Sequence, residues 1–270
     1  MRKNMGNDSL LRQYDIPKVA LSLGVPLSVV DTTDTFHIAE WDHPLLQAAQ
    51  VYWLRELPIH PFHILINTSR RFRRLSNLEL SPLVKDIKKI QSISLGLSDA
   101  RLQLIKPATK RYDVFFSGTD TSPLREQARR VLRKLKAEGT CRVYLPENPL
   151  SREEFYQACA ESYLVLSPSG LGWDCYRHYE AALCSSVPVM NYPTIRRYHP
   201  FIDGEHGFYY DLEENGLERC LRQALTDRPR LIKMGQTARE HVLTHHLYSK
   251  LLRMMLKEPD QKAGSATLGN

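Results

Sequence analysis

Residues 164–189 place the strongest constraint on the fold of this chain. They read LVLSPSGLGWDCYRHYEAALCSSVPV: an apolar strand-like run, a glycine-bearing turn, a helical segment and a second apolar strand opening at Pro188. A strand that turns into a helix and returns to a second strand is the pattern of a parallel βαβ unit. Two charged residues of the helical segment, Arg177 and Glu180, are three positions apart and so share roughly one helix face.

The turn of this unit, residues 167–170, is expected to bind an anion. Backbone N–H groups at the start of a helix lack partners within the helix, and the helix dipole favours negative charge there. Arg177 lies in the first turn, where the dipole does not favour a cation, so a bound diphosphate would explain its position. Glu180, one turn further on, could accept the hydroxyls of a ribose. The alternative is an ordinary ion pair between Arg177 and Glu180 on the helix surface.

The rest of the chain also alternates between strand and helix signals. Before residue 100, strand-length apolar segments occur at 27–31, 62–67 and 91–95, and residues 43–57 have helical spacing. After it, strands are expected at 113–116, 142–145, 163–167, 187–190 and 207–210, and helices at 123–138, 151–161, 174–185, 213–226 and 229–256. This alternation predicts an α/β fold of doubly wound parallel sheets, with ligands at the carboxyl ends of the strands.

The segment 100–111 is expected to separate two units. It is polar and basic and is broken by Pro107. The prediction is a smaller N-terminal unit over residues 1–105 and a larger C-terminal unit over residues 106–257. Residues 258–270 are expected to form a disordered tail.

Composition indicates a soluble globular protein. With 42% hydrophobic and 25% charged residues, the chain can bury a core. No apolar run approaches the roughly 20 residues that a membrane helix needs, and no secretion signal is recognisable. The five cysteines are widely spaced and odd in number, which favours reduced thiols over disulfides or a zinc site. These features predict a cytoplasmic protein.

The formal charge of +7 has two interpretations. Basic residues gather at 70–74, at 85–89 and along 125–136. Solvated helix faces and a phosphate-binding cleft are favoured, because stacking aromatic residues are not interleaved with these clusters. A nucleic acid or another anionic surface is the alternative partner.

Four short motifs follow one another in the C-terminal unit: Asp113-Val-Phe-Phe-Ser-Gly118, Ser167-Pro-Ser-Gly170, Arg177-His-Tyr-Glu180-Ala-Ala and Val187-Pro-Val. Together they resemble the donor-binding half of GT-B glycosyltransferases. The similarity is greatest to the spore-coat-maturation type and to family 1-like enzymes, and it covers about residues 20–255. The resemblance implies a GT-B-like fold with Rossmann-type sheets, in which the N-terminal, acceptor-side domain is truncated.

The resemblance also implies a function. It is that of a metal-independent hexosyltransferase-like enzyme that uses a nucleotide sugar, UDP- or GDP-linked, as its substrate and needs no cofactor. Arg177 would stabilise the charge on the departing nucleoside diphosphate, and Glu180 would bind the ribose. The other donor-binding residues would be Ser117, Gly118, Thr119, Arg125, Gly170 and Gly172, and the loop 144–150 would lie against the base. For Arg125, a solvated position on a basic helix is the alternative.

The acceptor side is less defined. Inverting transfer needs a general base near the acceptor hydroxyl, for which Asp31, Asp34 and His37 are candidates. Asp31 could instead be a turn acid. Gly172 departs from the family, since many retaining members carry a Glu eight residues before the ribose-binding one, and here Asp174 is the nearest acid. The acceptor and the choice between retention and inversion stay open.

Two alternatives to this function remain. A non-catalytic nucleotide-binding or assembly module, completed by a partner chain or a second copy, would also suit a shortened N-terminal domain. A glycosyltransferase that acts on nucleic acid would use the basic cluster 70–74 for phosphate contacts.

Overall fold

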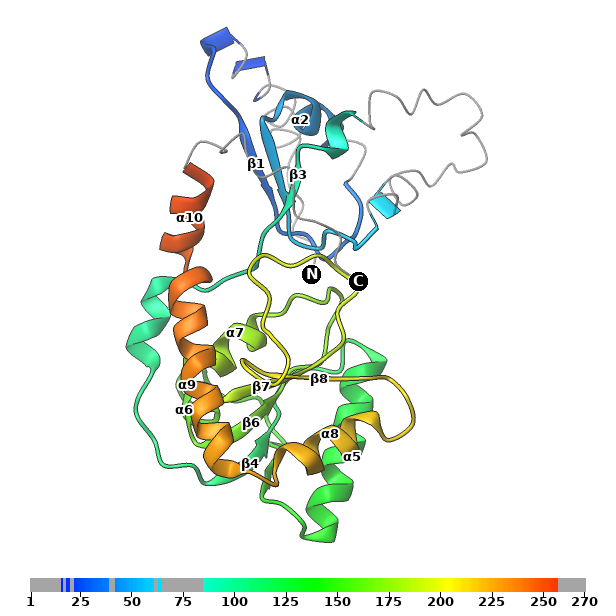
Figure 1. The fold of residues 1–270 in the computed structure, drawn as a ribbon, viewed down its shortest axis with the longest axis vertical. Helices are drawn as coiled ribbons and strands as arrows, with labels where there is room; N and C mark the ends of the chain where they lie inside the picture. The colour runs from blue at the N-terminus through cyan, green and yellow to red at the C-terminus, as the bar shows by residue number, and fades with distance from the viewer. Residues whose placement is uncertain are drawn as a thin grey trace.

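The structure is a computed structural model that describes residues 16, 18–19, 22–38, 42–60, 63–64 and 85–256. The described residues form two β-sheets, which lie at opposite ends of the molecule (Figure 1). Every strand pair in both sheets is parallel. This confirms the predicted α/β fold with parallel sheets. The basic cluster 70–74 lies outside the described residues.

The smaller sheet has three strands in the order β1-β2-β3. They are β1 (Ser28–Asp31), β2 (Val51–Leu54) and β3 (Ile90–Ser92), and a short helix, α2 (His43–Ala48), precedes β2. The helix expected over 43–57 is therefore wrong beyond Ala48. A central strand that is buried on both faces does not alternate between apolar and polar residues, so its apolar spacing also fits a helix.

Three strands were also predicted for this region, and the structure describes two of them fully. The strand at 27–31 is confirmed, and the one at 91–95 begins at Ile90 and ends at Ser92. Of the strand expected at 62–67, only His63 and Ile64 are described, and both are helical. The remainder of that segment lies outside the described residues.

The larger sheet has five strands in the order β5-β4-β6-β7-β8. The strands are β4 (Tyr112–Phe115), β5 (Val143–Tyr144), β6 (Ser162–Leu166), β7 (Val187–Asn191) and β8 (Phe208–Tyr210). The helices are α5 (Pro123–Glu138), α6 (Arg152–Ala160), α7 (Tyr176–Leu183), α8 (Gly216–Ala224), α9 (Arg228–His245) and α10 (Tyr248–Leu256). The expected elements from residue 113 to 226 are all present, with ends shifted by up to three residues.

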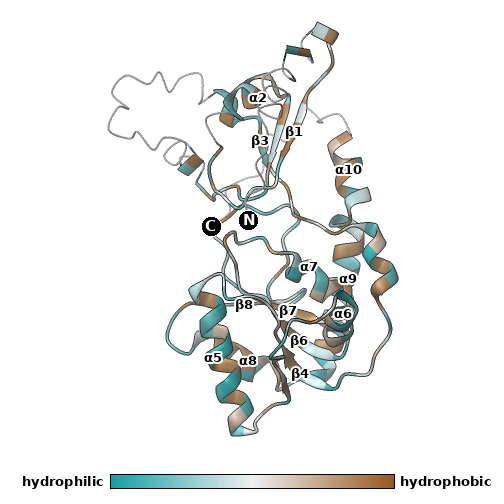
Figure 2. Ribbon diagram, turned by 180° about the vertical axis from the view of Figure 1, so that it is seen from behind, coloured by the Kyte–Doolittle hydropathy of each residue, from teal (hydrophilic) through white to brown (hydrophobic). Residues whose placement is uncertain are grey.

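The core of this half lies between the sheet and its helices. Its strands are hydrophobic, whereas α5 carries much hydrophilic sequence on its outer side (Figure 2). Val114, Leu164 and Leu166 of the strands pack with Leu132 of α5, and all four are fully buried. Burying side chains of this kind contributes about 1.5–3 kcal/mol each.

The strand order of the larger sheet reverses at one point, between β4 and β6. The chain passes from β4 to β5 on one side and then returns to place β6 on the other side of β4. The chain that leaves β4 therefore continues to one side of the sheet, and the chain that leaves the neighbouring strand β6 continues to the other side. Ligands of open α/β sheets bind at such a switch point, outside the carboxyl ends of the strands.

The last helical stretch crosses to the smaller sheet. The single helix expected at 229–256 is wrong, because α9 ends at His245 and α10 begins at Tyr248. In the break, Leu97 N donates to His246 O and Tyr248 N donates to Leu97 O, both over 2.8 Å. Leu251 of α10 then packs against strand residues of the smaller sheet, among them Trp53. The limits of the two predicted units stay a prediction.

Two further properties concern the chain as a whole. All five cysteines are free thiols. Among the described residues, no helix is both long enough and apolar enough to cross a membrane.

The start of α6 provides a stability test. Ser151 Oγ accepts from Glu154 N over 3.2 Å, and the Glu154 carboxylate accepts from Ser151 N over 2.8 Å, which forms a capping box. We expect Ser151→Ala to lower the free energy of unfolding by about 1 kcal/mol, measured by urea denaturation. Glu153→Ala in the same turn is the control and is expected to change it by less than about 0.5 kcal/mol. Equal effects of the two substitutions would contradict the capping role.

Candidate functional site

The turns that follow β4 and β6 lie side by side at the switch point. The first contains Ser117, Gly118 and Thr119 and leads into α5, and the second contains Gly170 and leads towards α7. Ser122 Oγ, just before α5, donates to Ser169 O over 2.7 Å and joins the two turns. The structure thus brings together the two glycine turns that the sequence predicts to bind the donor.

Two arginines enter the space beside these turns. Arg125 comes from the first turn of α5 and Arg177 from the first turn of α7. A Cβ added to Gly118 would overlap Nη2 of Arg177, and one added to Gly170 would lie 2.8 Å from Nη2 of Arg125. Glycine at both positions therefore allows each guanidinium to lie directly against a turn.

Both guanidiniums retain N–H groups that have no acceptor in the part of the chain that the structure describes. Nε of Arg125 and both Nε and Nη1 of Arg177 are shielded from water and have no hydrogen-bond partner among the described residues. Arg125 is anchored by its Nη1, which donates to Thr121 Oγ1 over 2.8 Å. Burial and, next, the charge of Arg125 lower the pKa of Arg177. Two cations held together with unpaired donors form a site suited to a multiply charged anion.

Arg177 and Glu180 do not form the surface ion pair that was the alternative. Glu180 pairs instead with Arg101, which lies in a short helix, Asp99–Leu104, between the two sheets. Tyr156 of α6 also contacts the same oxygen, with its hydroxyl 3.3 Å from Glu180 Oε1. The second carboxylate oxygen, Oε2, accepts no hydrogen bond from the described part of the chain. The carboxylate is thus oriented through one oxygen while the other is available.

The N–H groups just before α7 have a partner from the other half of the chain. Glu56, which follows β2 and is fully buried, accepts from Trp173 N over 3.0 Å and from Asp174 N over 2.9 Å. Burial raises the pKa of Glu56, against the lowering effect of these two N–H groups. Part of the helix start that the sequence predicts to bind an anion is therefore occupied by a carboxylate of the protein itself.

Asp174 and His178 stabilise the same loop from inside. Asp174 is buried and accepts from Leu95 N and from the hydroxyl of Tyr179, each over 2.6 Å. The His178 ring lies 2.7 Å from Ser167 Oγ through Nδ1 and 2.9 Å from Trp173 O through Nε2. Each side chain binds protein groups through both of its polar atoms, so neither is available to contact a sugar.

The acceptor-side candidates lie at the end of β1 and just after it. Asp31 accepts from both N and Oγ1 of Thr33, so it is the turn acid that was the alternative to a base. Asp34 is half exposed and binds Arg55 through Oδ1, while its Oδ2 accepts no hydrogen bond from the described residues. His37 is half-buried. Asp34 is thereby linked, through Arg55, to the neighbouring Glu56 and the loop before α7.

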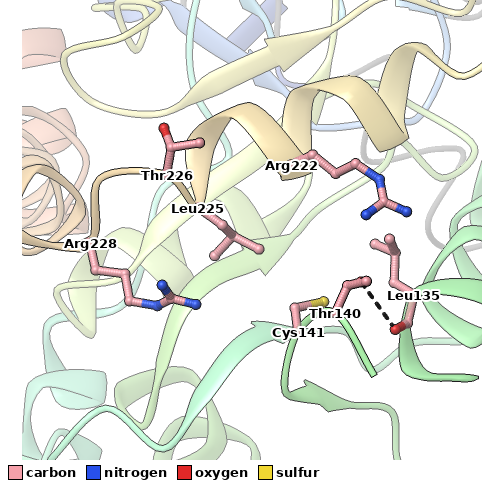
Figure 3. A pocket seen from close by; sticks show the side chains of 7 residues that line it. All are labelled: Leu135, Thr140, Cys141, Arg222, Leu225, Thr226 and Arg228. Carbon is pink, nitrogen blue, oxygen red and sulfur yellow. Dashed lines mark hydrogen bonds between the residues drawn. The ribbon is translucent and has the colours of Figure 1, made fainter. Parts of the chain in front are cut away.

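A separate pocket lies at the opposite ends of the strands. It encloses about 270 Å³ between the ends of α5 and α8, where Arg222 and Arg228 flank Cys141 (Figure 3). Both arginines are already paired, since Arg222 binds Glu138 and Glu218 and Arg228 binds Asp113. Burial raises the pKa of Cys141. Among the described residues, none of the buried side-chain atoms without a hydrogen-bond partner belongs to this pocket, in contrast to the switch point.

Sequence reasoning missed several residues of the site. Arg55, Glu56, Arg101 and Tyr156 all contact predicted site residues, or the loop that carries them, from distant parts of the chain. The only local sequence signal for these residues was the charged pair Arg55-Glu56, which directly follows an aromatic and apolar run. Among the described residues, no cluster of three or more His, Cys, Asp or Glu side chains could hold a metal ion.

Comparisons with known proteins bear on this geometry. The family described as the RXYLT1 C-terminal domain matches residues 98–196, which include both glycine turns, Arg177 and Glu180. No curated protein matches the chain.

Solved structures are similar over most of the chain. Alr3699/HepE from Anabaena, in complex with UDP, is 11% identical and covers 91% of this chain and 75% of its own, with a TM-score of 0.56. A glycosyltransferase from Rickettsia africae is 10% identical; the match covers 94% of this chain and 81% of that protein, with a TM-score of 0.53. Sucrose-phosphate synthase from Thermosynechococcus elongatus is 13% identical, with coverage of 94% and 78% and a TM-score of 0.51. This chain therefore has a GT-B glycosyltransferase-like fold, as its motifs predict.

Proposed function

We propose that this protein transfers a sugar from a nucleoside-diphosphate sugar to a hydroxyl group of an acceptor. The observation that carries the proposal is the pair of arginines at the switch point, Arg125 and Arg177, whose buried N–H groups have no acceptor among the described residues. A diphosphate offers the charge and the several oxygens that such a pair binds. The complex of the similar HepE structure with UDP is consistent with this choice.

Each predicted donor residue then has a chemical role. The turns at Ser117–Thr119 and Gly170–Gly172 bring their backbone close to the diphosphate, and Arg125 and Arg177 bind its oxygens. Negative charge grows on the diphosphate as the sugar bond breaks, so the two guanidiniums stabilise the leaving group. Oε2 of Glu180 accepts the ribose hydroxyls while Arg101 and Tyr156 fix Oε1. The proposal requires no metal, because the guanidiniums offset the charge of the diphosphate.

In this proposal, the acceptor hydroxyl binds next to Asp34. Oδ2 of Asp34 is available at a half-exposed position after β1, where it can take the proton from the attacking hydroxyl. His37, three residues further along, is the second candidate for the base.

A panel of nucleotides tests the donor site. We expect UDP or GDP to raise the thermal midpoint of the protein by several degrees, since saturation at about 100 times Kd adds about 2.7 kcal/mol of stability. The matching monophosphates, UMP and GMP, are expected to raise it much less because they lack the second phosphate. If neither diphosphate shifts the midpoint beyond its monophosphate, the proposal is wrong.

Turnover separates an enzyme from a binding module. The same protein, incubated with UDP- or GDP-linked sugars, is expected to release the nucleoside diphosphate faster than a heat-inactivated sample. Nucleotide binding without any release over a broad panel of sugars and hydroxyl acceptors would favour the non-catalytic module.

A further inference from the structure

Glu56 fills the position at which the loop before α7 lacks a side chain. A Cβ added to Gly172 would lie 2.5 Å from Glu56 Oε1 and 2.9 Å from Arg55 Nη2. Gly172 shows no left-handed backbone angle, so its conformation alone does not call for glycine. The requirement is spatial: the carboxylate and guanidinium of the smaller-sheet half occupy the volume that a side chain of residue 172 would take.

Glu56 accepts hydrogen bonds from the two residues that precede the N-cap of α7. Cys175, at the N-cap of α7, makes no side-chain cap bond, and the two N–H groups of Trp173 and Asp174 are bound by Glu56 from 117 and 118 residues away. A side chain within the loop commonly does this work, for instance an Asp that accepts from the N–H two residues ahead. Here the anion at the start of α7 is supplied by the other half of the fold.

The same carboxylate is joined to the acceptor side. Arg55 Nη2 lies 3.4 Å from Glu56 Oε1 and also binds Asp34. Arg55 is 5% exposed and Glu56 is fully buried, whereas Asp34 is half exposed. A short chain of charges thus runs from the proposed acceptor-side base to the loop that carries the donor turn.

We propose that Glu56 is a positioning residue that supplies the acceptor for the N–H groups of the loop before α7, in the space beside Gly172, and that Arg55–Glu56 fixes the donor loop relative to Asp34. This inference rests on the proposed function for its binding readout. The loss of Glu56 releases two N–H groups and lets the loop before α7 move away from the geometry in which Arg177 meets the diphosphate.

The test moves the carboxylate from one half of the chain to the other. Glu56→Ala removes it, Gly172→Asp adds one that can accept from Asp174 N, and the double variant has only the relocated carboxylate. We expect each single variant to bind UDP about tenfold more weakly than the unmodified protein, the first through loss of the loop bonds and the second through overlap with Glu56. The double variant is expected to bind within about threefold of the unmodified protein. Isothermal titration calorimetry with UDP measures all four affinities.

Two outcomes overturn the inference. One is a double variant that binds about 100-fold more weakly, which is the product of independent losses. The other is a Glu56→Ala variant that binds UDP as well as the unmodified protein does. The thermal midpoints of the same four proteins without nucleotide form a second double-mutant cycle. In this cycle, the inference requires the double variant to be more stable than both single variants. This cycle still decides the question if the unmodified protein does not bind UDP, which would count against the proposed function alone.

Discussion

Arg177→Met is expected to weaken nucleoside-diphosphate binding about 100-fold while making the ligand-free protein more stable. The loss follows from the removal of charge-assisted hydrogen bonds to the diphosphate, which contribute about 1.5–3 kcal/mol each. The gain in stability follows from the buried Nε and Nη1 of Arg177, which have no partner among the described residues. Their desolvation destabilises the folded state, and methionine removes that cost. Methionine keeps much of the apolar contact, so the free energy of unfolding is expected to rise by about 1–3 kcal/mol.

Arg129→Met is the matched control. Arg129 and Arg177 each lie with the guanidinium carbon 5.3 Å from the centre of the Phe116 ring. Arg129, however, is paired: it binds Asp120 over 2.7 Å and also donates to Gly118 O. Its replacement is expected to lower stability. Urea denaturation and titration with UDP and GDP measure both quantities, and a loss of stability in Arg177→Met would count against an anion site.

Acid is expected to destabilise this protein through its buried histidines. Burial lowers the pKa of His178 from 6.5 to about 3, with smaller contributions from the charges of Arg177, Arg197 and Arg125. The folded state therefore holds His178 neutral, while the unfolded chain takes up a proton below about pH 6.5. Stability is full above that pH and is lost as the pH falls towards 3. Between pH 7 and pH 5, this residue alone is expected to cost about 2 kcal/mol.

His246 adds to this effect in the same direction. It is 1% exposed, its pKa is well below 6.5, and it lies at the break between α9 and α10. Its Nδ1 is 2.9 Å from Ser94 Oγ and its Nε2 is 3.0 Å from His199 O. Its burial and the nearby His241 disfavour the protonated ring, so the junction between the two sheets is expected to loosen in acid.

Urea denaturation at pH 7, 6 and 5 measures this dependence. His178→Gln removes the titrating ring but keeps an amide that can bond in its place, and its stability is expected to fall less steeply with pH. His63→Gln, at an exposed position, is the control and is expected to keep the slope of the unmodified protein. Identical slopes for all three proteins would show that His178 does not cause the acid sensitivity.

The larger sheet was predictable because its signals are local. Strand lengths, helix periods and glycine turns from residue 112 to 226 are properties of neighbouring residues, and the structure places the corresponding elements close to the expected limits. In the smaller sheet, the two edge strands β1 and β3 were predicted in part or in full, but the central strand β2 was not. The run Val51–Leu54 is buried on both faces, and only its pairing with β1 and β3 distinguishes it from the end of α2.

The candidate site divides in the same way. Glycine turns, Arg177 and Glu180 could be named from the sequence because they sit at fixed offsets from a strand end within one βαβ unit. That Arg177 has no acid partner among the described residues could not be predicted, because the competing residue, Arg101, lies 79 positions before Glu180. Contacts of that separation depend on how the intervening elements pack, which local periodicity does not report.

The sequence by itself determined a parallel α/β fold and the order of elements in its larger half, and it named the residues that we propose to bind a diphosphate. Tertiary structure decided which of those residues are free to act. It placed Arg125 beside Arg177 at the switch point and brought Glu56 to the start of α7. The physical reason is that a buried charge is defined by all the groups packed around it, and here those groups come from both halves of the chain.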